Sequence, residues 1–245
     1  MNFQLLKFLK KFFTNFLNSV YPPRCMSCNA NVSSCHQFCE KCWSKIEFIS
    51  EPYCHKCGLP HPVHYLSNKD CESCNKLKPR FNQCKSVFRY SAVTNKLIKK
   101  FKFHDTTIYG QSFAQLIFKS ARSLVEASDF LIAVPMYKKD LKVRKYNHAF
   151  LIARALSKLA SKKLLPDTLI KHRQSLSQSG LTRSERLKNL EKAFSIAKNH
   201  DLIKGKNILL IDDVMTTGTT LNECSKVLKR AGAKRVIVLT VARSY

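Results

Sequence analysis

The sequence is poor in acidic residues: 16 Asp and Glu stand against 43 Lys and Arg, so the 245-residue chain has a formal net charge of +27. It also lacks any run of 18 or more uncharged apolar residues, so it predicts no transmembrane helix. Hydrophobic residues still make up 44% of the chain, which indicates a globular protein and excludes a disordered one. A surface this positive attracts polyanions, and we expect a partner that carries phosphates.

The N-terminal twenty residues lack the features of a cleaved signal peptide. Three lysines interrupt the apolar stretch and no small-residue cleavage site follows, so we expect a cytoplasmic protein that is not secreted. Apolar residues recur at helical spacing from Leu5 to Val20, which predicts an amphipathic helix over residues 1–20. Two interpretations of this helix stay open: packing against its own domain, or peripheral binding at the inner face of the membrane.

Ten of the eleven cysteines lie between Cys25 and Cys84. Eight of them form C-x-x-C pairs: Cys25/Cys28, Cys39/Cys42, Cys54/Cys57 and Cys71/Cys74. Each such turn presents two sulfurs to one point, and a tetrahedral Zn²⁺ takes four ligands of this kind. The spacing therefore predicts a duplicated zinc-ribbon domain over residues 21–84 with two structural Zn²⁺ ions. The two sites pair either in sequence order or in a crossed arrangement.

Two other interpretations of the cysteines are less favoured. A disulfide framework needs an oxidising compartment, and the chain shows no secretory signal. A redox protein needs one C-x-x-C pair at the start of a helix, not four pairs. Because protein ligands fill every zinc position, we expect no catalytic metal in this domain.

From residue 85 onward, apolar segments alternate with helical patterns. This alternation predicts an α/β domain over residues 85–245, with a parallel sheet covered on both faces. The expected strands span residues 86–90, 130–134, 169–170, 194–197, 207–211 and 236–241. The expected helices span residues 93–103, 109–127, 148–162 and 221–230.

One strand runs into two adjacent acids and then into a hydroxyl-rich loop, in the sequence I-L-L-I-D-D-V-M-T-T-G-T-T from Ile208 to Thr220. Ligands of parallel sheets bind at the carboxyl ends of the strands, which puts Asp212 and Asp213 at the binding edge. Amides at a helix N-terminus, together with threonine hydroxyls, form a nest for a monophosphate, and the two carboxylates can accept hydrogen bonds from ribose hydroxyls. No lysine follows the glycine, so this is not a nucleoside-triphosphate P-loop. A catalytic acid/base pair is less favoured, because neighbours on a strand point to opposite faces.

This segment resembles the phosphoribosyl-pyrophosphate motif of type I phosphoribosyltransferases, and the whole chain resembles the ComF family of competence proteins. Further matching stretches are Y-P-P-R-C-x-x-C at residues 21–28, V-P-M at 134–136, R-K-Y-N-H-A at 144–149 and Q-S-G-L-T-R-S-E-R-L-K-N-L at 178–190. The resemblance implies an α/β, type I phosphoribosyltransferase-like domain with a parallel sheet, preceded by a small zinc-ribbon module whose metal sites each have four cysteine ligands. The family pattern at residues 144–149 is R-G-F-N-Q-A, so Lys145 and His148 replace a glycine and a glutamine.

Carried onto this sequence, the resemblance assigns the ribose hydroxyls to Asp212 and Asp213. The residues it assigns to the 5′-phosphate are Thr216, Thr217, Gly218, Thr219 and Thr220. The residues it implies for a pyrophosphate loop are Pro135, Met136, Tyr137, Lys138 and Lys139. Phosphoribosyl pyrophosphate would be the ligand, with Mg²⁺ accompanying it.

The ComF resemblance also implies handling of incoming single-stranded DNA in the cytoplasm during natural transformation, beside membrane-associated uptake machinery. A basic patch would track the DNA backbone, and the aromatics Phe101 and Phe103 divide between base stacking and the core. The expected DNA-binding residues are Lys99, Lys100, Lys102, Arg144 and Lys145. Two other functions stay open: an active phosphoribosyltransferase acting on an unidentified base, and a non-catalytic sensor of a phosphoribosyl ligand.

Overall fold

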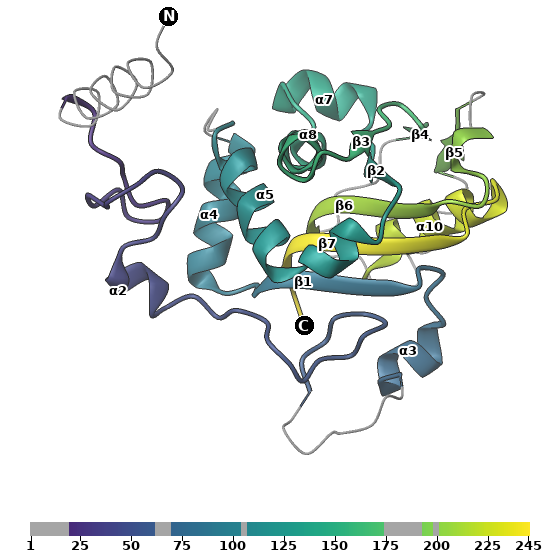
Figure 1. Cartoon of the computed structure of the whole chain (residues 1–245), viewed down its shortest axis with the longest axis horizontal. Coiled ribbons are helices and arrows are strands. Elements are labelled where there is room, and N and C mark those ends of the chain that lie inside the picture. Colours follow the sequence, from purple (N-terminus) through teal and green to yellow (C-terminus); the bar gives the residue numbers. More distant parts are fainter. Residues whose placement is uncertain (1–19, 62–69, 104–106, 174–192, 198–200) are drawn as a thin grey trace, which may run out of the picture. The chain divides into compact units, whose positions relative to one another are not determined.

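The computed structural model describes residues 20–61, 70–103, 107–173, 193–197 and 201–245 (Figure 1). The chain divides into two compact units, one ending at Ile46 and the other running from Glu47 to Tyr245. This division falls between the two cysteine-rich halves, whereas the sequence suggested a boundary after residue 84. The second half of the ribbon therefore belongs to the same compact unit as the sheet. Residues 1–19 of the predicted N-terminal helix lie outside the described residues.

The first unit is built from turns around cysteines. Asn29 N donates to Cys25 O at 3.0 Å, which closes the first C-x-x-C turn, and an antiparallel bridge joins Arg24 to Asn31. The short helix α2 (Glu40–Trp43) begins after Cys39, which is its N-cap residue, and its one buried residue is Cys42. The cysteines therefore supply much of what this small unit buries.

The second unit contains a five-stranded sheet in which every neighbouring pair is parallel, as the sequence predicted. The strand order is β1-β7-β6-β2-β3 (Figure 1). Its strands are β1 (Gln83–Arg89), β2 (Phe130–Ala133), β3 (Lys163–Leu164), β6 (Asn207–Met215) and β7 (Arg235–Arg243). The strands expected at residues 169–170 and 194–197 do not join this sheet: as β4 (Leu169–Lys171) and β5 (Phe194–Ile196) they form a separate antiparallel pair.

The second unit also contains helices. They are α3 (Glu72–Leu77), α4 (Ala92–Phe103), α5 (Tyr109–Ser120), α6 (Arg122–Glu126), α7 (Lys138–Arg144), α8 (His148–Ala160) and α10 (Thr219–Arg230), with a 3₁₀ turn, η1 (Asp201–Ile203). The single helix expected over residues 109–127 is wrong, because Ala121 has φ −133° and divides it into α5 and α6. Helix α7 was not predicted, since its sequence K-K-D-L-K-V-R is short and has no buried residue.

The central strands are buried on both faces, which explains their continuous apolar runs. Ile208 and Leu210 of β6 belong to the same core cluster as Leu221 and Leu228 of α10. Side chains alternate along a strand, so the equally buried Leu209 faces the other side of the sheet, where α5 and α8 pack on the strands. The two-sided cover leaves the carboxyl ends of the strands as the place for polar side chains.

Strand β6 extends beyond the predicted end at Ile211, because its pairing with β7 continues to Met215 opposite Arg243. Asp212 and Asp213 therefore lie within the paired part of β6 and not after its end. Their backbones are fixed by the sheet, which makes them rigid positions for a binding site.

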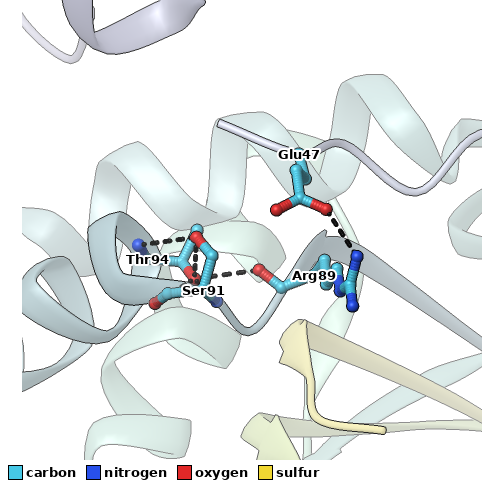
Figure 2. A network of polar contacts seen from close by, with 4 residues as sticks. All are labelled: Glu47, Arg89, Ser91 and Thr94. Carbon is cyan, nitrogen blue, oxygen red and sulfur yellow. Dashed lines mark hydrogen bonds and ion pairs between the residues drawn. The ribbon is translucent and has the colours of Figure 1, made fainter. Parts of the chain in front are cut away.

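The start of helix α4 is fixed by a small polar network that Figure 2 shows. Ser91 N donates to Thr94 Oγ1 at 2.7 Å, and Thr94 N donates back to Ser91 Oγ, which is a capping box with threonine in place of the usual acid. Thr94 Oγ1 also donates to Arg89 O at 2.8 Å, and the Arg89 guanidinium pairs with Glu47 at 2.9 Å. The network joins the end of β1 to the helix that carries the basic residues Lys99, Lys100 and Lys102.

Candidate functional site

The structure gathers the eight paired cysteines into two groups in sequence order, so the crossed pairing is not adopted. The first group is Cys25, Cys28, Cys39 and Cys42, and the second is Cys54, Cys57, Cys71 and Cys74. Within each group the four sulfurs lie within 4.8 Å of one another.

The spacing of the sulfurs fits a zinc ion. The Sγ–Sγ distance is 3.5 Å for Cys28 and Cys39, 3.9 Å for Cys54 and Cys74, and 3.6 Å for Cys57 and Cys71. Four sulfurs about 2.3 Å from one tetrahedral zinc lie about 3.8 Å apart, so the donor set and its size both suit this metal. The sites are closed by four protein ligands, which is the arrangement of structural zinc.

The unpaired Cys84 lies near the second group but has another role. It is completely buried, and its thiol donates to Met215 Sδ at 3.4 Å. Burial raises the pKa of the Cys84 thiol to about 12, so the thiol is neutral near pH 7. Gly58, in the second group's first turn, has φ +69°, and a Cβ built there would lie 3.1 Å from Cys84 O. The turn thus needs glycine to pack this closely on β1.

The loop between β6 and α10 contains the residues that the sequence assigned to a 5′-phosphate. We call residues 216–220 the phosphate loop. Gly218 is the N-cap of α10 with φ +74°, and Thr217 Oγ1 lies 2.9 Å from Thr219 Oγ1. Helix α10 has 12 residues, so its first-turn amides and its dipole favour an anion at this end. Thr216 is the most exposed residue of the loop, whereas Gly218 and Thr219 are buried.

Asp213 is paired with a lysine from a different element. Lys102 Nζ of α4 lies 2.8 Å from Asp213 Oδ2, and the two side chains are only 21% and 15% exposed. Lys102 was expected to lie on an open basic patch, but its ammonium group points to the carboxylate. Removing one partner of a pair so largely shielded from water costs more than at the surface, because it leaves the other charge buried and uncompensated.

Asp212 has different surroundings. Burial, and after it the charge of the neighbouring Asp213, raise the pKa of its carboxyl to about 7, against the opposing effects of the Asp213 backbone amide, Lys102 and Lys171. The sequence did not identify Lys171 of β4, whose own pKa burial lowers. On a strand, neighbouring side chains leave on opposite sides, so the two acids meet different partners. They form two distinct positions and not one symmetric pair.

The segment expected to be the pyrophosphate loop lies between β2 and α7. Val134 N donates to Ile211 O at 2.9 Å, which places the start of this segment beside β6. Pro135, Met136 and Tyr137 are loop residues, whereas Lys138 and Lys139 are exposed residues of the first turn of α7. This edge thus brings together the predicted pyrophosphate segment and the predicted ribose acids.

The R-K-Y-N-H-A stretch holds this edge in place. Asn147 caps α8 by accepting from Phe150 N, and its side-chain amide donates to Val134 O at 2.9 Å. Lys145, which replaces the family's glycine, has φ +65°, a conformation that L-residues rarely adopt. His148, which replaces a glutamine, is 1% exposed, and neither ring nitrogen has a hydrogen-bond partner among the described residues. Burial lowers the pKa of His148, so its ring is neutral near pH 7.

The predicted basic patch combines the ends of α4 and α7. The Arg144 guanidinium lies 5.7 Å from the centre of the Phe103 ring, and Phe103 is 64% exposed. Phe101, by contrast, is buried and packs edge-on against Phe113 and His148. Phe101 therefore belongs to the core and Phe103 is open to solvent, whereas the expected stacking of Phe103 on a base stays a prediction. Lys99 and Lys145 are exposed, and Lys100 and Arg144 are half-buried.

No described helix has both the length and the hydrophobicity that a membrane crossing requires. Two family models match the chain, a double zinc ribbon domain over residues 16–77 and a phosphoribosyl transferase domain over residues 146–244. The fold and the two cysteine groups thus define a phosphoribosyltransferase-like protein with a double zinc ribbon.

Three curated relatives match over most of their length. Competence protein F of Haemophilus influenzae is 30% identical over 236 residues, covering 94% of this chain and 99% of that protein. Competence protein ComFC of Bacillus subtilis is 28% identical and covers 84% of each chain. DNA utilization protein YhgH of Escherichia coli strain K12 is 24% identical, covering 91% of this chain and 98% of that protein. The chain belongs to the ComF family of competence proteins.

Proposed function

We propose that this chain handles incoming single-stranded DNA during natural transformation, and that its α/β domain binds a phosphoribosyl pyrophosphate-type ligand. The observation that carries the proposal is the phosphate loop, which joins the two acids at the end of β6 to the N-terminus of α10. The names of these relatives, which refer to competence and DNA utilization, agree with the DNA role. The proposal assigns the protein to the cytoplasm, at the inner face of the membrane where DNA-uptake machinery delivers the strand.

The proposed cradle has three parts along one edge. The phosphate loop takes the 5′-phosphate through its amides and threonine hydroxyls. Asp212 and Asp213 accept hydrogen bonds from the ribose hydroxyls, and residues 135–139 face the pyrophosphate. Mg²⁺ would enter with the ligand, since pyrophosphate oxygens and water are the ligands that this ion prefers.

The ion pair between Lys102 and Asp213 adds a condition to ribose binding. Asp213 Oδ2 already accepts from Lys102 at 2.8 Å, so a ribose hydroxyl must either share this carboxylate or displace the lysine. Displacement would release one more cation from the end of α4, next to Phe103. Ligand binding in the cradle would then strengthen the adjoining basic patch.

The proposed DNA surface is formed by the ends of α4 and α7. Exposed Lys99 and Lys145 supply charge, and the exposed Phe103 ring, which Arg144 covers from one side, offers a face for a base. Each phosphate contact should contribute about −0.7 to the slope of log affinity against log salt concentration. A DNA affinity that does not change between low and high salt would contradict this role.

Calorimetry with phosphoribosyl pyrophosphate, with and without Mg²⁺, and with a single-stranded oligonucleotide tests both halves of the proposal. The double variant Asp212→Asn/Asp213→Asn should lose phosphoribosyl pyrophosphate binding, because charged hydrogen bonds of about 1.5–3 kcal/mol each are removed. Glu126→Gln, at an exposed surface ion pair, is the matched control and should bind like the parent.

Turnover separates the alternatives. An active transferase would also release pyrophosphate when offered a base, and the double variant would abolish this release. A sensor binds the ligand and releases nothing. If DNA binding survives the double substitution but is lost on zinc chelation, the DNA surface lies outside the cradle.

A further inference from the structure

Arg243, at the end of β7, is a buried cation with an unusual partner. It is 7% exposed, and its Nη2 donates to the sulfur of Cys57 at 3.6 Å. Its Nε and Nη1 atoms are buried and have no hydrogen-bond partner among the described residues. A guanidinium shielded from water is costly unless negative charge lies beside it.

The second cysteine group supplies this negative charge. Zn²⁺ with four thiolates carries a formal charge of −2, and Cys57 is one of the four ligands of this group. Groups that donate to a metal ligand orient it and strengthen metal binding. Arg243 has the position of such a group, because its guanidinium touches a ligand sulfur without occupying the metal's coordination shell.

The backbone around the same residue holds Met215, which directly precedes the phosphate loop. Arg243 lies opposite Met215 in the register of β6 and β7, and Ser244 N donates to Met215 O at 2.9 Å. Met215 is the residue directly before the phosphate loop. Its methyl carbon packs closely on Gly218, since a Cβ built at Gly218 would lie 2.6 Å from Met215 Cε.

A cavity of about 240 Å³ separates the ribbon from the loop around these contacts. Cys57, Cys74 and Leu77 line it on the ribbon side, and Thr217, Asn222 and Arg243 line it on the sheet side. Because the two sides are not packed solidly together, the specific links across the junction matter. One is the Arg243–Cys57 contact, and another is Asn222 Oδ1, which accepts from Arg80 N at 2.7 Å.

We propose that the second zinc site holds the phosphate loop in its binding conformation, with Arg243 as the positioning residue that transmits the state of the site. The part of this inference that concerns ligand affinity rests on the proposed function. The first cysteine group belongs to the other compact unit and serves as the internal comparison. The two halves of the duplicated ribbon therefore have different roles: only the second controls the cradle.

The test uses the full-length, zinc-loaded chain and its Arg243→Met and Arg243→Lys variants. Arg243→Met should lose zinc to a chelator about 10–100-fold faster from one of its two sites. Amide hydrogen exchange in the peptide covering residues 213–222 should become faster in the absence of any ligand. Arg243→Lys keeps the charge and should lie between the parent and Arg243→Met in both measurements.

The matched control is Cys25→Ser/Cys28→Ser, which removes the first zinc site. Zinc content should fall from two ions to one, while exchange of residues 213–222 keeps its parental rate. Cys71→Ser/Cys74→Ser should also lose one zinc, but it should accelerate exchange in the loop. If Arg243→Met proves insoluble, the two cysteine variants still compare the sites.

Calorimetry with phosphoribosyl pyrophosphate separates this inference from the proposed function. If the parent binds no ligand, the proposed function fails, and hydrogen exchange alone decides the inference. Parental exchange and chelation rates in Arg243→Met would overturn the inference, as would equal loop exchange after loss of either zinc site. Faster loop exchange with loss of the second site alone would support it.

Discussion

Lys102 of α4 and Asp213 of β6 form an ion pair with 2.8 Å between Nζ and Oδ2, although 111 positions separate them in the sequence (213 − 102). The pair joins the basic end of α4 to the acidic end of β6. Lys102, which the sequence predicted to bind DNA, thus neutralises Asp213, which it predicted to bind ribose.

A double-mutant cycle measures this pair. Lys102→Met and Asp213→Asn should each destabilise the ligand-free protein, and the double variant should cost less than the sum. We expect a coupling energy of about 1–2 kcal/mol, because the pair is largely but not wholly shielded from solvent. Urea unfolding at pH 7 gives the four free energies. Strictly additive costs would mean that the pair contributes nothing.

Stability should depend on pH through Asp212. Its pKa is raised to about 7, from an ordinary value of 3.8. Between these values the folded state binds more protons than the unfolded state, so this group makes the free energy of unfolding fall as pH rises from about 4 to 7. Asp212→Asn should remove this pH-dependent loss of stability. The free energy of unfolding of the variant, relative to that of the parent, should therefore be about 1–3 kcal/mol higher at pH 8 than at pH 5.

Urea midpoints of parent and variant at pH 5 and pH 8 check this expectation. Zinc thiolates also respond to acid, but both proteins share that effect and it cancels in the difference. Asp201→Asn, at an exposed residue, is the control and should show the same difference from the parent at both pH values. A stabilisation by Asp212→Asn that does not change with pH would be inconsistent with a raised pKa.

Two substitutions at Lys145 can separate the effect of its backbone strain on stability from the effect of its charge on DNA binding. With φ +65°, its backbone has a conformation that glycine adopts freely, so Lys145→Gly should stabilise the fold by about 1 kcal/mol. Lys145→Ala removes the same charge but keeps the strain. If Lys145 contacts DNA, both variants should reduce the salt slope of oligonucleotide binding by about 0.7. Lys234→Ala, directly before the start of β7, should leave the slope unchanged.

Gly218 and Gly205 form a matched pair. Both have positive φ, +74° and +72°, but a Cβ at Gly218 would meet Met215, whereas a Cβ at Gly205 would have nothing within 4 Å. Each alanine variant should cost about 1 kcal/mol from its backbone conformation. Only Gly218→Ala should also weaken phosphoribosyl pyrophosphate binding, because Met215 must shift beneath the loop. Equal ligand affinities for the two variants would contradict this.

The local pattern of the sequence was sufficient for most of the sheet. Continuous apolar runs identified β2, β6 and β7, because strands buried on both faces carry little else. The sequence did not predict helix α7, because none of its residues is buried and it therefore has no apolar face that recurs at helical spacing. The extension of β6 to Met215 depends on pairing with β7, which no local pattern contains.

The site could be predicted only where its residues are neighbours in sequence. The two acids, the phosphate loop and the C-x-x-C pairs are local patterns with a clear chemistry. Lys102 beside Asp213, Lys171 near Asp212 and Arg243 against Cys57 are contacts between distant segments, and each of these basic residues looks ordinary in a sequence with 43 of them. The partner of each acid, and hence the raised pKa of Asp212, required the structure.

The position of β7 between β1 and β6 has a consequence for the order in which the nascent chain folds. Until the ribosome has released this strand, β1 has no neighbour to join it to β6, so the sheet cannot close. The second cysteine group is complete by Cys74 and can take up zinc much earlier, with its charge of −2 uncompensated by Arg243. We expect the nascent ribbon to bind its metal weakly at first and to tighten only when the last strand is inserted.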